Sequence, residues 1–263
     1  MAQPIVQIDA FTDKPFAGNP AAVCLMDSPR DERWMQLVAR EMNLSETAFL
    51  YPTSDGYNLR WFTPEVEVEM CGHATLASAH HLWESGRAKP EHTLRFHTRS
   101  GLLTASLRGD LIVLDFPARP ATEVSPPPGL FDALGVTGTF VGKSTYDYLV
   151  EVASEEIVRA VSPNQRQLKS MGVRGVIITA KSTSSEFDIV SRFFAPGAGI
   201  DEDPVTGSAH CTLGPYWAPK LGKTELRAFQ ASARGGALTV TVRGDRVLLG
   251  GHAVTILRGQ LIE

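Results

Sequence analysis

The feature that most constrains the fold of this chain is an internal repeat. The segment RWFTP at residues 60–64 returns as RFFAP at 192–196, and SGLLTASLRGDLIVL at 100–114 returns as GGALTVTVRGDRVLL at 235–249. The offsets are 132 and 135 residues, and the matches come in the same order. This period is far longer than that of a solenoid, so it indicates two duplicated domains of about half the chain each.

Both halves share one local pattern, in which a strand is followed by a glycine-containing loop and a helix of small residues. CGHATLASAHHL follows the first RWFTP-type strand, and DPVTGSAHCTL follows the second. A helix that is apolar on nearly all sides belongs inside a domain. The sequence therefore predicts an α+β fold of two pseudo-symmetric halves, each a run of strands around one central helix.

The predicted boundaries follow from composition. Residues 1–116 form the first half, and 117–129, which hold five prolines, form a linker. Residues 130–263 form the second half, although the last residues could return to the first.

Within the first half we expect a helix that Ser28 caps, with Pro29 at its first position. The first central helix is expected to run from about Cys71 to about Glu84.

Charge and cysteine content exclude several classes of protein. The net charge of -4 argues against a nucleic-acid surface, and three cysteines are too few for a disulfide framework. The N-terminus shows no signal peptide, and no apolar run reaches the roughly 20 residues of a membrane span. We expect a cytoplasmic protein that binds neither nucleic acid nor membrane.

The starts of the two central helices are the predicted ligand site. Helix N-termini carry partial positive charge and free backbone N–H groups, so they attract anions. If the halves face each other, both helix starts converge on one inter-domain cleft, the usual place for a ligand. The expected partner is a small anionic substrate.

Three side chains near these loops could carry chemistry. Glu46 could act as acid and base if an apolar cleft raises its pKa, although an isolated glutamate is more often exposed. Asp203 could accept a hydrogen bond or share a proton, or simply cap the helix that follows. His73 could orient a substrate or relay a proton, or be a packing residue at a helix start.

The residue spacings match no common motif for binding a metal ion or a nucleotide cofactor. Cys71, His73, His80, His81, His210 and Cys211 fit no common zinc pattern. No P-loop, G-x-G-x-x-G fingerprint or G-x-S-x-G elbow occurs. We therefore predict no metal site and no cofactor.

Four motifs in register resemble one family. DAFTDKPFAGNPAAV, SETAF, RWFTPEVEVEMCGHAT and EDPVTGSAH are similar to segments of the phenazine-biosynthesis isomerase (PhzF-like) family, and the resemblance covers nearly the whole chain. It implies the diaminopimelate epimerase-like fold, in which each half is a curved, mostly antiparallel sheet around a central helix. It also implies a cofactor-independent isomerase that forms a homodimer.

The resemblance assigns roles residue by residue. The acid/base glutamate of the family falls on Glu46, its loop aspartate on Asp203 and its histidine on His73. The predicted substrate-binding residues lie in the loops that carry the same motifs: Asn19, Gly72, Thr206, Gly207 and Ser208.

Two departures limit what can be carried over. The related epimerases use one cysteine from each half, and here Cys71 stands in the first place while alignment puts Pro204 in the second. Phenazine-forming members often have alanine at both places. The prediction is therefore an isomerase of a small carboxylate-bearing metabolite by proton shuttling. The alternatives are an amino-acid epimerase or racemase, and a non-catalytic small-molecule binding protein.

Overall fold

The computed structural model describes residues 2–262 and divides into two compact units. Unit 1 comprises Met1–Asp115 together with Gly250–Glu263, and unit 2 comprises Phe116–Leu249. Residues 117–129, treated above as a linker, are assigned to unit 2 and contain the short strand β9 (Thr122–Glu123).

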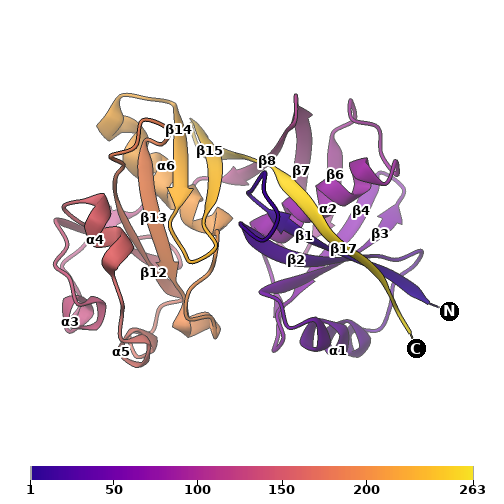
Figure 1. The fold of residues 1–263 in the computed structure, drawn as a ribbon, viewed down its shortest axis with the longest axis horizontal. Coiled ribbons are helices and arrows are strands. Elements are labelled where there is room, and N and C mark those ends of the chain that lie inside the picture. The colour runs from indigo at the N-terminus through magenta and orange to yellow at the C-terminus, as the bar shows by residue number, and fades with distance from the viewer. Residues whose placement is uncertain (1, 263) are drawn as a thin grey trace. The chain divides into compact units, whose positions relative to one another are not determined.

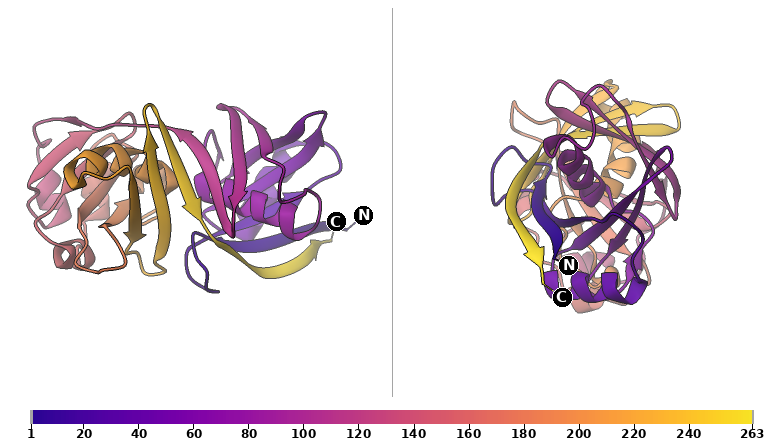
Figure 2. Two further views of the ribbon diagram at one scale, coloured as in Figure 1. Left: turned by 90° about the horizontal axis from the view of Figure 1, so that it is seen from above. Right: turned by 90° about the vertical axis from the view of Figure 1, so that its right-hand side faces the viewer.

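Unit 1 is a curved sheet around a buried helix, α2 (Gly72–Glu84), and a second helix, α1 (Glu32–Met42), packs against two of its strands (Figure 1). Strand β17 runs antiparallel beside β1, which places Leu261 opposite Gln3 (Figure 2). The strands of this unit are β1 (Gln3–Ala10), β2 (Asn19–Leu25), β3 (Glu46–Thr53), β4 (Gly56–Phe62), β5 (Glu67–Val68), β6 (Leu94–Thr98), β7 (Gly101–Arg108), β8 (Leu111–Pro117) and β17 (Ala253–Leu261).

Unit 2 repeats this plan around its own buried helix, α6 (Gly207–Leu221). Its remaining helices are short: α3 (Leu130–Leu134), α4 (Glu155–Ala160), α5 (Gln165–Lys169) and the 3-10 turn η1 (Pro196–Ala198). Its strands after β9 are β10 (Phe140–Lys143), β11 (Asp147–Glu151), β12 (Gly175–Lys181), β13 (Ile189–Phe194), β14 (Glu225–Gln230), β15 (Gly236–Arg243) and β16 (Arg246–Gly251).

The order of strand pairing is the same in both units. In unit 1, β1–β2 is antiparallel, β2–β3 parallel, β3–β4 antiparallel, β4–β6 parallel and β6–β7 antiparallel. In unit 2, β10–β11 is antiparallel, β11–β12 parallel, β12–β13 antiparallel, β13–β14 parallel and β14–β15 antiparallel. In both units, helices connect the first parallel pair, and the central helix follows the fourth strand of the series. The α+β class is confirmed.

The repeated arginine makes the same kind of ion pair in each unit. Arg60 donates to Glu67 through Nε and a terminal nitrogen at 2.7 and 2.6 Å, and Arg192 donates to Glu202 in the same way at 2.7 and 2.9 Å. Each guanidinium also lies over the phenylalanine two residues further along its own strand. Two-point arginine–carboxylate pairs fix geometry well, so each one anchors the loop that follows its strand.

The predicted start of the first helix is wrong. Helix α1 begins at Glu32 with Asp31 as its N-cap, whose Oδ1 accepts a hydrogen bond from the backbone N–H of Trp34 at 3.2 Å. Ser28 and Pro29 lie before the helix. Both Ser28 and Asp31 satisfy the capping preference, and Asp31 is the one whose side chain accepts a backbone N–H of the first turn.

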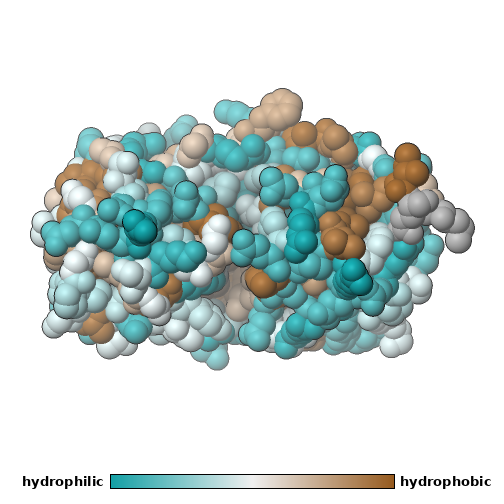
Figure 3. Space-filling model, turned by 90° about the horizontal axis from the view of Figure 1, so that it is seen from below, coloured by the Kyte–Doolittle hydropathy of each residue, from teal (hydrophilic) through white to brown (hydrophobic). Residues whose placement is uncertain are grey.

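Hydrophilic residues cover most of the face drawn in Figure 3, and apolar residues form small groups there. Within residues 2–262, every helix is too short or too polar to cross a membrane.

Candidate functional site

Three segments of unit 1 place polar side chains at the start of α2. Strands β2 and β3 run parallel, with Ala21 opposite Glu46, so the starts of both strands lie at one edge of the sheet. Asn19 is the first residue of β2 and Glu46 the first of β3. Helix α2 begins at Gly72, which brings His73 of its first turn to the same place.

His73 is the centre of this group. Its Nε2 lies 3.2 Å from Oε2 of Glu46, and its Nδ1 lies 3.1 Å from the amide nitrogen of Asn19. The sulfur of Cys71 lies 3.5 Å from the same Nδ1. The structure therefore brings together Glu46, His73 and Asn19, three of the predicted site residues, with Gly72 next to His73 in the chain.

The group is largely removed from solvent. The His73 side chain is 5% exposed and that of Glu46 is 13% exposed. Burial lowers the pKa of His73 to about 3, so its imidazole is neutral near pH 7. A neutral imidazole donates through one nitrogen and accepts through the other. When the Asn19 amide donates to Nδ1, the Nε2–H donates to Glu46 and orients its carboxylate.

In unit 2, the polar group lies before α6. Oδ2 of Asp203 accepts a hydrogen bond from the hydroxyl of Thr206 at 2.5 Å. Gln230, at the end of β14, accepts from the backbone N–H of Thr206 at 2.9 Å and donates to the carbonyl of Asp203 at 2.7 Å. Thr206 is the N-cap residue of α6, so Asp203 holds the residue from which the helix starts.

Comparing the two helix starts corrects one alignment. Cys71 is the N-cap residue of α2 and Thr206 that of α6. Thr75 Oγ1 donates to the Cys71 carbonyl at 2.6 Å, and His210 Nδ1 lies 2.8 Å from the Thr206 carbonyl, four residues back in each case. The counterpart of Cys71 is thus Thr206 rather than Pro204. Gly207 and Ser208, in the first turn of α6, match Gly72 and His73.

Sequence reasoning missed Gln230, which is fully buried. No motif contains it, and its partners lie 24 to 27 residues earlier in the chain. It also missed that Glu46, Cys71 and His73 form a cluster in which one ligand atom from each lies within 4.8 Å of the others.

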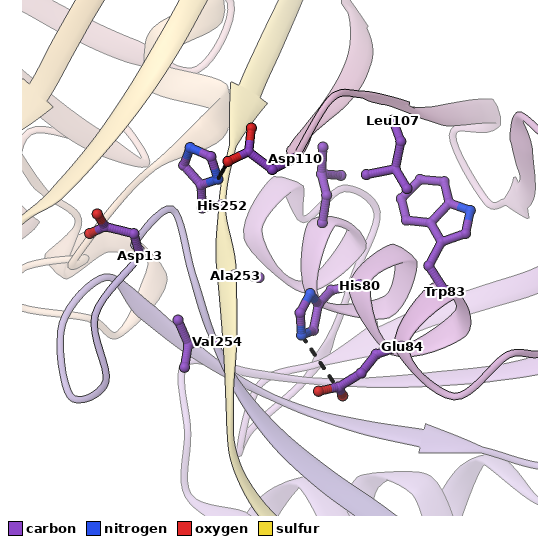
Figure 4. A pocket seen from close by; sticks show the side chains of 10 residues that line it. Asp13, His80, Trp83, Glu84, Leu107, Asp110, His252, Ala253 and Val254 are labelled. Carbon is purple, nitrogen blue, oxygen red and sulfur yellow. Dashed lines mark ion pairs between the residues drawn. The ribbon is translucent and has the colours of Figure 1, made fainter. Parts of the chain in front are cut away.

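A separate pocket in unit 1, of about 380 Å³, was not predicted either (Figure 4). Figure 4 shows His80 of α2 beside β17, Trp83 of the same helix next to Leu107, and Asp110 and His252 at one end. His80 Nε2 lies 3.2 Å from the Thr255 hydroxyl, which donates to Glu84 at 2.7 Å. These contacts tie α2 to β17, so the histidine has a structural role.

Comparison with known proteins finds relatives over the whole length of the chain. The model of the phenazine biosynthesis-like (PhzC-PhzF) protein family matches residues 8–259. An uncharacterized isomerase of Halalkalibacterium halodurans is 55% identical over 263 residues, which is 100% of this chain and 99% of that protein.

Solved structures extend the likeness to the fold. The crystal structure of a PhzF-family phenazine biosynthesis protein from Enterococcus faecalis has a TM-score of 0.95 and 40% identity, with each chain covered completely. A probable proline racemase from Agrobacterium radiobacter has a TM-score of 0.67 at 13% identity, covering 99% of this chain and 93% of that one, which shows the fold alone. The fold is the diaminopimelate epimerase-like fold that the sequence predicts, and the chain belongs to the phenazine biosynthesis-like (PhzC-PhzF) protein family.

Proposed function

We propose that the protein is a cofactor-independent isomerase of a small carboxylate-bearing metabolite, with Glu46 as its acid and base. The observation that carries the proposal is the contact between the Glu46 carboxylate and the buried, neutral His73. A relative with 55% identity is named an uncharacterized isomerase, which supports the reaction class.

The reaction needs only a proton to move. The Glu46 carboxylate removes a proton from a carbon next to a conjugated system, and the electron pair of that C–H bond delocalises. The resulting Glu46 carboxylic acid then gives the proton to a different carbon, so atoms and electrons balance. Positioned acid/base groups of this kind contribute about 10²–10⁴-fold to a rate.

In this proposal, the N-termini of the two central helices bind the carboxylate of the substrate. The backbone N–H groups at the N-terminus of α2, beginning at Gly72, can accept a substrate carboxylate. The matching turn of α6, Gly207 and Ser208, has the same chemistry in unit 2. Asn19 and Thr206 add polar contacts beside each helix start.

An epimerase is the second candidate, because Cys71 lies beside His73 in a fold shared with a probable proline racemase. Its counterpart Thr206 is a hydroxyl instead of a second thiol, which argues against a two-thiol mechanism. An epimerase would exchange the α-proton of an amino acid and would lose that activity in Cys71→Ser.

The test is a screen in deuterated water against a panel of small carboxylates, read by NMR. We expect one class of compound to lose a carbon-bound proton and to form an isomer with a shifted double bond. Glu46→Gln should abolish this exchange and still bind the compound. Exchange at the wild-type rate in Glu46→Gln, or α-carbon inversion that requires Cys71, would contradict the proposal.

A further inference from the structure

Glu46, Cys71 and His73 each offer a different kind of metal ligand at one point in unit 1. A carboxylate oxygen, a thiol sulfur and an imidazole nitrogen lie within 4.8 Å of one another at the start of α2. Spacing rules could not find this group. Glu46 begins strand β3, far from the others in the sequence, and Cys71 and His73, at the start of α2, are only two residues apart.

The interatomic distances are close to those of a tetrahedral zinc site. Zn–N and Zn–O bonds of about 2.0–2.2 Å and a Zn–S bond of about 2.3 Å place neighbouring ligand atoms roughly 3.3–3.6 Å apart. His73 Nε2 lies 3.2 Å from Glu46 Oε2 and 4.0 Å from the Cys71 sulfur. A shift of the sulfur by about half an ångström would bring it into this range from Nε2, and its distance from the Glu46 oxygen, which is at most 4.8 Å, would have to shorten as well.

The surroundings also suit a metal ion. A neutral imidazole carries an electron pair on its unprotonated ring nitrogen, and Nε2 of His73 is the nitrogen that faces Glu46. The Asn19 side chain next to Nδ1 can turn its amide oxygen to accept the Nδ1–H, which leaves Nε2 facing Glu46. An outer partner of this kind fixes the orientation of a metal-binding histidine.

We propose that Glu46, Cys71 and His73 form a binding site for a thiophilic divalent cation of the zinc class, and that this ion inhibits the enzyme. A thiolate ligand selects zinc, cobalt or cadmium over magnesium and calcium. Three protein ligands leave a fourth position open, as in accessible zinc sites. The inhibition rests on the proposed function, because a carboxylate bound to the ion cannot take up a proton.

Cobalt(II) is the probe for binding, since it reports its ligands spectroscopically. The full-length protein, treated with a chelator, is titrated with Co²⁺ and then with Zn²⁺. We expect one equivalent of Co²⁺ to give a thiolate-to-cobalt charge-transfer band in the near ultraviolet, and Zn²⁺ to remove it. Cys71→Ser should lose the band and weaken Zn²⁺ binding by at least about 100-fold, the upper end of what loss of an outer partner causes.

The other two cysteines provide matched controls. Cys24 in β2 and Cys211 in α6 are buried thiols outside any disulfide, and burial raises the pKa of Cys211 to about 12. Cys24→Ser and Cys211→Ser should keep the cobalt band. In the wild-type protein, Zn²⁺ should also slow alkylation of Cys71, measured for each cysteine by mass spectrometry, which needs no variant.

Binding and catalysis are read separately, so each proposal can fail alone. A cobalt complex without the thiolate band, a band that survives in Cys71→Ser, or no binding at all overturns the metal site. If the band is present but Glu46→Gln keeps proton exchange, the proposed function fails while the metal site stands. If both hold, equimolar Zn²⁺ should abolish exchange in the wild-type protein, and unchanged exchange would refute the inhibition.

Discussion

Nε2 of His73 lies 3.2 Å from Oε2 of Glu46, and both side chains are mostly buried where α2 and β3 begin. This contact joins a residue of the central helix to the strand that carries the proposed base. Because the imidazole is neutral, it can donate one hydrogen bond to the carboxylate and hold it in place. In the proposed mechanism, His73 positions the base.

The first prediction concerns that contact. His73→Ala should lower the rate of proton exchange by about 100-fold, since a catalytic group that shifts by about 1 Å loses this much. His73→Gln, whose amide nitrogen can reach the place of Nε2, should recover part of the rate. The measurement is the exchange rate by NMR at saturating compound, with circular dichroism to confirm folding. Equal rates in the alanine variant and the wild type would show that the contact is not needed.

The second prediction separates charge from structure at Asp203. Asp203→Asn keeps an oxygen that accepts the Thr206 hydroxyl hydrogen, so the variant should still fold, although it loses a charge that acts on Arg174. If the negative charge takes part in catalysis, exchange should fall by about 10²-fold or more. The control is Gln230→Glu, which disturbs the same network from the other side. An exchange rate in Asp203→Asn equal to that of the wild type would assign Asp203 a purely structural role.

The repeat made the fold predictable to a large extent. The segments RWFTP and RFFAP lie in corresponding strands of the two units. Their arginines form corresponding ion pairs with Glu67 and Glu202. The two small-residue helices became the two buried helices, because small side chains allow the strands to approach on all sides. Each of these motifs is only a few residues long, so a single sequence is enough to recognise it.

The candidate site was predictable only where a motif contains it. His73 and Asp203 lie in recognisable loops, but Gln230 reaches Thr206 from a strand 24 residues away. The cluster of Glu46 with Cys71 depends on how strands β2 and β3 pair beside α2. Contacts such as these depend on tertiary packing, so they cannot be predicted from a local sequence pattern.

The third prediction is a large loss of stability in unit 2. Asp147 is buried and accepts two hydrogen bonds from Arg174, one of them at 2.9 Å. Asp147→Asn would remove the carboxylate that pairs directly with the Arg174 guanidinium and leave Asp203 as the other acidic group acting on it, which should lower the free energy of unfolding by about 3–5 kcal/mol. Urea unfolding followed by circular dichroism measures this.

A matched control for that measurement is the exposed pair of Arg95 and Asp55, 3.5 Å apart. Asp55→Asn should change stability by about 0–1 kcal/mol, since water screens exposed pairs. Similar effects of the two substitutions would contradict the role assigned to burial.

The fourth prediction is a loss of stability on mild acidification. Burial lowers the pKa of His73 to about 3 and that of His210 to about 4, against 6.5 in an unfolded chain. Below pH 6.5 the unfolded state therefore binds protons that the folded state does not, and stability falls as the pH is lowered. Each histidine should remove up to about 1.4 kcal/mol per pH unit, and the effect is absent above pH 6.5.

His210 allows this to be tested by substitution, because its Nδ1 lies 2.8 Å from the Thr206 carbonyl and an asparagine amide can replace that donor. Urea unfolding of His210→Asn and of the wild type is compared between about pH 7.5 and about pH 5. Carboxylates such as Glu155, whose pKa is lowered to about 2, contribute mainly below this window. The stability of the variant should fall less steeply by up to about 1.4 kcal/mol per pH unit, and parallel slopes would show that His210 is protonated equally in both states.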